Sequence, residues 1–104
     1  MDLRKIASVF DHVMSNYRVV YADFNREEFA PYRERKIGGF VRLDEKTIYI
    51  HSELSREERE LTLLHEVLSI YYYEEKILRH DEEIEDETRK LYKKALPLLQ
   101  RYIN

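Results

Sequence analysis

The sequence changes from the spacing of a strand to the spacing of a helix at Ser55. In the preceding segment TIYIH, Ile48 and Ile50 should share one face of a strand, because side chains alternate along an extended chain. Ser55 precedes Arg-Glu-Glu, and Glu58 lies three residues after it, which is the spacing of a capping box. These signals predict a strand that leads, through a short turn, into a helix from about residue 56 to about residue 76.

The segments before this helix predict one more helix and about three strands in all. Residues 2–16 carry apolar side chains at helical spacing, and residues 17–24, YRVVYADF, have the β-branched and aromatic content of a short strand. Residues 25–36 are polar and contain Pro31, so we expect a loop or a short turn of helix there. The runs IGGFVRL and TIYIH flank the polar triplet DEK, a pattern typical of a β-hairpin.

Two helices are expected after the hairpin. The inward stripe of the first is predicted to consist of Leu61, Leu64, Leu68 and Tyr71. The second should begin near Asp81, and its helical spacing is kept by Ile84, Thr88, Leu91, Ala95, Leu98 and Tyr102. Pro97 is expected to kink or interrupt it, because proline lacks an amide hydrogen and clashes with the preceding turn. The predicted fold class is α+β, with an antiparallel-type sheet, in a single domain over residues 1–104.

The composition narrows the class of protein. A chain of 104 residues with 43% hydrophobic residues suits one domain with a modest core. Its net charge of -3 and scattered basic residues give no reason to expect a nucleic-acid or membrane partner. Without cysteine it has no disulfide or thiolate metal site, and without a signal-peptide pattern or a long apolar run we expect it to be cytoplasmic. The 38% of charged residues resembles the composition of proteins from hot environments.

The helix segment LTLLHEVLSIYYY contains a pair of residues typical of zinc peptidases. In such enzymes two histidines four residues apart bind zinc, and the glutamate after the first acts as general base on the zinc-bound water. Here His65 and Glu66 are in place, but Ser69 occupies the position of the second histidine. A catalytic zinc site uses three protein ligands and one open position, so this segment alone would leave the site incomplete.

The run IGGFVRLDEKTIYIHSELSREERELTLLHEVLSIYY resembles the metallopeptidase-like core of the ImmA/IrrE family, which is of the zincin type. In that family a strand of the form IYIN leads through a short turn into a helix of the form rfTlaHElgH. Here IYIHSELS and LTLLHEVLS occupy the corresponding places, and Thr62 falls where the family has its threonine. Ser69 in place of the second histidine, and Val67-Leu68 in place of Leu-Gly, depart from the family pattern.

The resemblance continues into the last helix and covers about residues 37–97. The family has a helix of the form E-x-E-A-x-x-F-A, which supplies the third metal ligand and is followed by a proline. The segment EDETRKLYKKALP places Glu85, Glu87 and Leu91 at the matching spacing, with Thr88 in place of the usual alanine and Pro97 one residue early. The resemblance therefore implies a minimal zincin-like domain in which His65 and Glu87 are the remaining metal ligands.

Two protein ligands and a glutamate imply a degenerate metal site. Glu66 would be a vestigial general base, and no stoichiometric zinc is expected, although zinc stays possible if another side chain completes the site. The candidates for that role are Glu85, if the alignment is slipped on the last helix, His80 in the turn between the helices, and His51 at the end of the hairpin. A second interpretation makes His65 a histidine at the edge of the core, hydrogen-bonded to Glu87 or Glu85.

Three functional hypotheses follow. The first is a zincin-like protein with an incomplete metal site, which is non-catalytic and acts by binding another protein. The second is a working metal-dependent peptidase with an unusual third ligand. The third, which rests on the setting of many members of the family, is a regulatory module of a toxin-antitoxin or phage-derived system.

Overall fold

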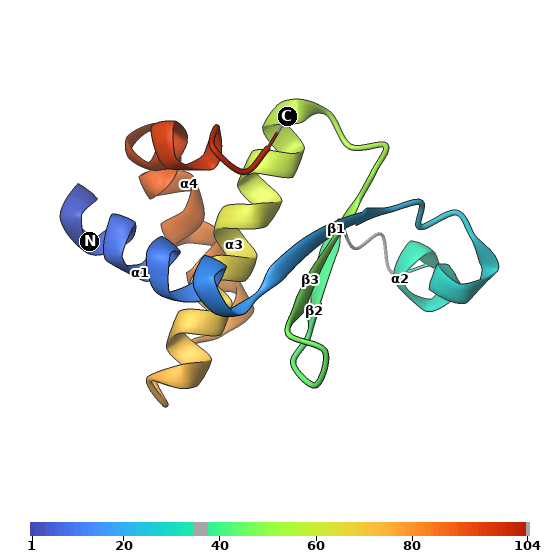
Figure 1. Cartoon of the computed structure of the whole chain (residues 1–104), viewed down its shortest axis with the longest axis horizontal. Coiled ribbons are helices and arrows are strands. Elements are labelled where there is room, and N and C mark those ends of the chain that lie inside the picture. Colours follow the sequence, from blue (N-terminus) through green and yellow to red (C-terminus); the bar gives the residue numbers. More distant parts are fainter. Residues whose placement is uncertain (35–37, 104) are drawn as a thin grey trace.

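The computed structural model describes residues 1–34 and 38–103, in which helices cover both faces of a three-stranded sheet (Figure 1). The elements are α1 (Leu3–Asn16), β1 (Arg18–Ala22), the short turn η1 (Glu27–Phe29), α2 (Ala30–Glu34), β2 (Gly39–Arg42), β3 (Thr47–His51), α3 (Arg56–Glu74) and α4 (Asp81–Leu99). The predicted α+β class is confirmed, as is the order of a helix, three strands and two helices. Ile37, with which the predicted hairpin began, lies outside the described residues.

The sheet has the order β1-β3-β2, so that β1 and β2 form its two edges. The predicted hairpin is present, since β2 and β3 are antiparallel with Phe40 opposite Tyr49. β1, however, pairs with β3 in parallel, with Val20 beside Tyr49, so the sheet is mixed where an antiparallel type was expected. The chain passes from β1 through η1 and α2 to the far edge, and β3 then returns between the two earlier strands.

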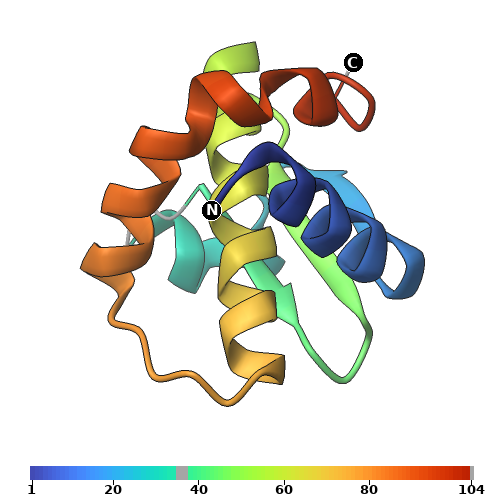
Figure 2. The same ribbon diagram turned by 90° about the vertical axis from the view of Figure 1, so that its left-hand side faces the viewer.

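The main core lies between one face of the sheet and the three long helices (Figure 2). Ile48 and Ile50 are both fully buried on this face, as their alternation predicted, and α3 packs over them. The predicted stripe of α3 is only partly right. Leu64 and Leu68 are buried, whereas Leu61 and Tyr71 are partly exposed and Leu63, Val67 and Ile70 are buried in addition. Because α3 contacts the sheet, α1 and α4 at once, it buries more of its surface than one amphipathic stripe.

An aromatic cluster covers the other face of the sheet. Phe24, which is 1% exposed, stacks on Phe29 from η1 and on His51 from the end of β3. Tyr32 of α2 stacks on Phe40 with ring centroids 3.8 Å apart, and Phe40 stacks on Tyr49. The segment between β1 and β2 thus forms a second, smaller packing layer, which extends to the right in Figure 1.

Side chains cap the N-termini of α1 and α3, and the cap of α3 is the predicted one. The side chain of Asp2 accepts a hydrogen bond from the amide of Lys5, and Ser55 and Glu58 form the reciprocal bonds of a capping box. Pro97 does not interrupt α4, which continues to Leu99. Its missing amide hydrogen removes the helical bond that the carbonyl oxygen of Lys93 would accept, and the last turns of α4 bend away from the axis of its first turns (Figure 2).

A close approach between β2 and α3 requires glycine at position 39. A Cβ atom there would lie 2.5 Å from Cγ2 of Thr62 and 3.0 Å from the carbonyl oxygen of Tyr49. We therefore expect Gly39→Ala to lower the free energy of unfolding by about 1–3 kcal/mol, measured by urea denaturation. Gly38→Ala is the control, because its Cβ would meet the flexible end of Leu54 at 3.2 Å. Equal stability of the Gly39→Ala variant and the natural protein would contradict this packing.

Candidate functional site

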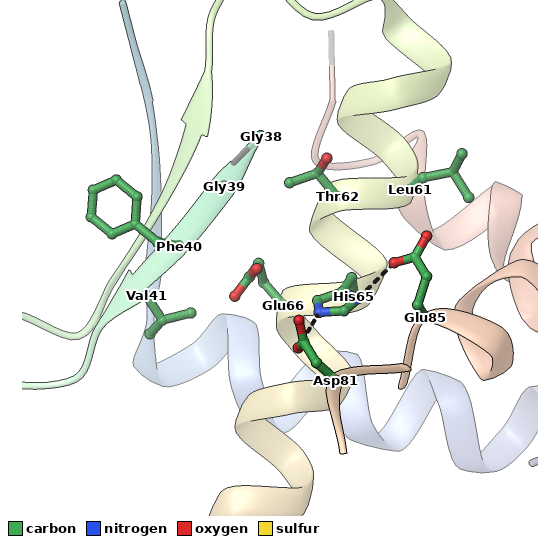
Figure 3. A pocket seen from close by; sticks show the side chains of 10 residues that line it. All are labelled: Gly38, Gly39, Phe40, Val41, Leu61, Thr62, His65, Glu66, Asp81 and Glu85. Atoms are coloured by element: carbon green, nitrogen blue, oxygen red, sulfur yellow. Dashed lines mark hydrogen bonds and ion pairs between the residues drawn. The ribbon is translucent and has the colours of Figure 1, made fainter. Parts of the chain in front are cut away.

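A pocket of about 510 Å³ lies between the edge strand β2, the middle of α3 and the first turns of α4 (Figure 3). Its walls come from three elements that are distant in the sequence. The lining residues are Gly38, Gly39, Phe40, Val41, Leu61, Thr62, His65, Glu66, Asp81 and Glu85. The pocket therefore contains both residues of the predicted His-Glu pair.

His65 lies between two carboxylates of α4. Its Nδ1 atom is 3.0 Å from Oε2 of Glu85, and its Nε2 atom is 3.2 Å from Oδ1 of Asp81 (Figure 3). Asp81 and Glu85 are four residues apart, so they lie on the same face of α4, one turn from each other. The two carboxylates hold the imidazole ring at opposite edges, and the side chain of His65 is only 15% exposed.

Glu87 does not contact His65. Its carboxylate instead accepts a hydrogen bond from the hydroxyl of Tyr72 on α3. The residue that the resemblance implied as the third metal ligand therefore has a different partner. Glu85, the fallback, is the glutamate that reaches His65. Two residues of helix correspond to about 200° of rotation, which separates the directions of Glu85 and Glu87 on α4. The expected approach of His65 and Glu87 is therefore corrected to an approach of His65 and Glu85.

Ser69, which stands in place of the second histidine, is turned toward its own helix. Its hydroxyl donates a hydrogen bond to the carbonyl oxygen of His65 at 2.9 Å. This local bond within one helical turn is a common arrangement for serine inside a helix. Ser69 is not among the residues that line the pocket. It therefore contributes no group to the surroundings of the His65 ring.

Glu66 points from α3 toward β2, into the pocket (Figure 3). Its carboxylate forms no hydrogen bond or ion pair with another residue in the described ranges 1–34 and 38–103. Removal from solvent raises the pKa of Glu66 from 4.5 to about 7; the nearby His65 lowers the pKa and Asp81 raises it further. The protein therefore places a carboxyl group with little solvation, and with no hydrogen bond or ion pair in the described ranges, in the wall of this pocket.

The other two candidate histidines lie elsewhere. His51 is on the aromatic face of the sheet, where its Nδ1 atom accepts a hydrogen bond from the amide of Phe24 at 3.2 Å. That face is opposite the one on which α3 packs, so the side chain of His51 is directed away from His65. His80 is exposed at the start of α4, where its amide donates to Glu83. Neither histidine lines the pocket of His65.

These donors do not fit a catalytic zinc site in the observed arrangement. A histidine that binds zinc must present the lone pair of one ring nitrogen to the metal, whereas both ring nitrogens of His65 lie within hydrogen-bonding distance of a carboxylate. Within the part of the chain that the structure describes, no group of three or more His, Asp or Glu side chains is placed to hold a metal ion. The second interpretation of His65, as a histidine hydrogen-bonded to a glutamate of the next helix, agrees with this geometry for Glu85.

The roles of Asp81 and of β2 in this pocket were not predicted from the sequence. Asp81 was expected only as the approximate start of the last helix, yet it is also a partner of His65. A signal for this role was present, because Asp81 and Glu85 share a helix face at the i, i+4 spacing. The residues of β2 gave no chemical signal, since they supply the pocket wall mainly through backbone and through the absence of a side chain at Gly39.

Comparisons with known proteins identify no relative of this chain. The chain matches no protein-family model, no curated protein and no solved structure. Among residues 1–34 and 38–103, no helix combines the length and the apolar character that crossing a membrane requires.

Proposed function

We propose that this chain is a zincin-like, non-catalytic protein that binds an extended segment of a partner protein in the groove beside β2. The proposal keeps the resemblance to the ImmA/IrrE family as its starting point and treats the metal site as incomplete. The observation that carries it is the engagement of His65 by Asp81 and Glu85 through both ring nitrogens. With Ser69 bonded to its own helix, the pocket offers no convergent ligand set, but it remains open.

The outer edge of β2 supports a role in protein binding. The amide of His51 donates to the carbonyl oxygen of Gly38 at 2.9 Å, which makes these two residues a hydrogen-bonded pair. Because such pairs alternate in an antiparallel ladder, the backbone groups of Gly39 and Val41 point away from β3. No strand in the described ranges pairs with this edge. An extended peptide could therefore add to the sheet as a fourth strand, directly beside the pocket.

The proposal predicts that blocking this edge abolishes binding of an extended peptide. Peptides would be selected from a randomised display library on the immobilised protein, and their affinities measured by calorimetric titration. Val41→Pro removes the outward amide hydrogen without removing a bond to β3, and it should weaken binding by at least about tenfold. Val41→Ala is the matched control, because it loses the same side chain and keeps the amide.

Two results would contradict strand addition at β2. One is equal binding by the Val41→Pro and Val41→Ala variants, with the fold of both verified by circular dichroism. The other is a library selection that yields no peptide for the natural protein.

A further inference from the structure

The pocket beside β2 is lined by three carboxylates and a single basic side chain, His65, which two of those carboxylates already contact. Glu66, Asp81 and Glu85 contribute three acidic groups, and the lining includes no lysine or arginine. Arg89 pairs with Oε1 of Glu85 at 3.2 Å, but it lines the neighbouring depression along α4 and not this pocket. Because His65 and Arg89 engage Asp81 and Glu85, the carboxylate of Glu66 is the acidic group of this pocket that favours a positively charged ligand group.

The three carboxylates differ in what they already bind. Asp81 and Glu85 both contact His65, whereas Glu66 forms no hydrogen bond or ion pair among residues 1–34 and 38–103 and only senses the charge of the nearby His65. A carboxylate with little solvation and no partner is costly to the folded protein. A ligand that brings a cation to Glu66 would remove this cost, so its binding would be favoured by the existing structure.

A strand added to the edge of β2 would direct side chains toward this carboxylate. Gly39 lies on the face of β2 that approaches α3, and a Cβ atom there would be 3.9 Å from Cγ of Glu66. Phe40 faces the aromatic cluster on the other side. Since side chains alternate along a strand, every second residue of the added segment would face the pocket above Glu66.

We propose that the pocket binds a basic side chain of the partner segment, with an arginine guanidinium paired to the carboxylate of Glu66. Guanidinium presents a planar set of donors that matches a carboxylate, and its aliphatic stem can lie along apolar walls such as Val41 and Leu61. The inference rests on the proposed strand addition and adds to it the chemical class of the residue that is recognised. It uses Glu66 as an anion, a role separate from that of a general base.

The test uses peptides selected from the display library and resynthesised with citrulline in place of the arginine. Citrulline keeps the shape of arginine and removes its charge. In calorimetric titrations the arginine peptide should bind the natural protein at least about tenfold more tightly than the citrulline peptide. Glu66→Gln should reduce this ratio to near one, while Glu75→Gln, which removes an exposed carboxylate at the far end of α3, should leave it unchanged.

The outcomes separate this inference from the proposed function. If arginine and citrulline peptides bind alike and Val41→Pro still abolishes binding, strand addition stands and the basic-residue site is overturned. If the ratio depends on Glu66 while Val41→Pro has no effect, the basic-residue site stands and strand addition is overturned. Selection of no peptide, or equal weakening of both peptides by Glu66→Gln, would also overturn the inference.

Discussion

At pH 8, Glu66→Gln is expected to raise the free energy of unfolding by about 2–3 kcal/mol. The reason is the poor solvation of the Glu66 carboxyl, which raises its pKa from 4.5 to about 7 in the folded protein. One pKa unit corresponds to about 1.4 kcal/mol, and access of solvent through the open pocket reduces the full value somewhat. Glutamine has nearly the same shape and no charge, so it removes the cost of holding an anion there.

The effect has a defined dependence on pH. Because the pKa of Glu66 is higher in the folded state, the folded protein binds more protons than the unfolded chain between pH 4.5 and about 7. The stability contributed by the protonated carboxyl is therefore fully present below pH 4.5 and is lost as pH rises toward 7. The difference in unfolding free energy between Glu66→Gln and the natural protein should grow over this interval and then stay constant.

Urea denaturation at a series of pH values measures this difference directly. All other titratable groups are common to the two proteins, so subtraction isolates the contribution of Glu66. The exposed Glu75→Gln variant is the control and should differ from the natural protein by less than about 0.5 kcal/mol at pH 8. A Glu66→Gln difference that is flat between pH 4.5 and 8 would show that the carboxyl is well solvated.

Ser69→His is expected to create a zinc site. The two imidazoles would lie one turn apart on the same face of α3, at a rise of about 6 Å, with the carboxylates of Asp81 and Glu85 nearby. Zinc would then have enough protein ligands, and its affinity should rise by at least about tenfold over that of the natural protein in calorimetric titration. The gain requires His65 to exchange a carboxylate partner for the metal.

Two further variants establish the origin of the gain. Ser69→Ala removes the bond from the hydroxyl to the carbonyl oxygen of His65 without adding a ligand, so it should not change zinc affinity. His65→Ala in the Ser69→His background should return zinc affinity to the level of the natural protein. Equal affinities of Ser69→Ala and Ser69→His would mean that the residue at position 69 is not directed to the face of His65.

The elements of the fold could be predicted because their signals are local. The capping box of Ser55 and Glu58 involves residues three apart, and the alternation of Ile48 and Ile50 is a property of one strand. The parallel pairing of β1 with β3 could not be predicted in this way. It depends on how the chain passes through η1 and α2 to the far edge of the sheet, and this long-range arrangement cannot be inferred from any short segment of the sequence.

The site could be predicted only in part, for a related reason. His65 and Glu66 could be identified from the sequence, because they are adjacent residues of one predicted helix and form a recognisable pair. The sequence did not identify which carboxylates of α4 face them, because this depends on the rotation of α4 against α3. The structure sets that rotation through the buried side chains of Ile84, Thr88 and Leu91, which direct Asp81 and Glu85 toward His65. Matching the family's spacing selected Glu87, which contacts Tyr72.

The state of His65 is the most direct test of the central claim, that this side chain is held by two carboxylates and is not a metal ligand. A long-range proton-nitrogen NMR spectrum resolves both ring nitrogens, and it can be recorded before and after addition of equimolar zinc. We expect Asp81→Asn to shift the Nε2 signal and Glu85→Gln to shift the Nδ1 signal, and zinc to leave both signals of the natural protein unchanged. A zinc-induced shift of either His65 nitrogen, reversed by a chelator, would show that the residue binds metal and would contradict the proposed non-catalytic function.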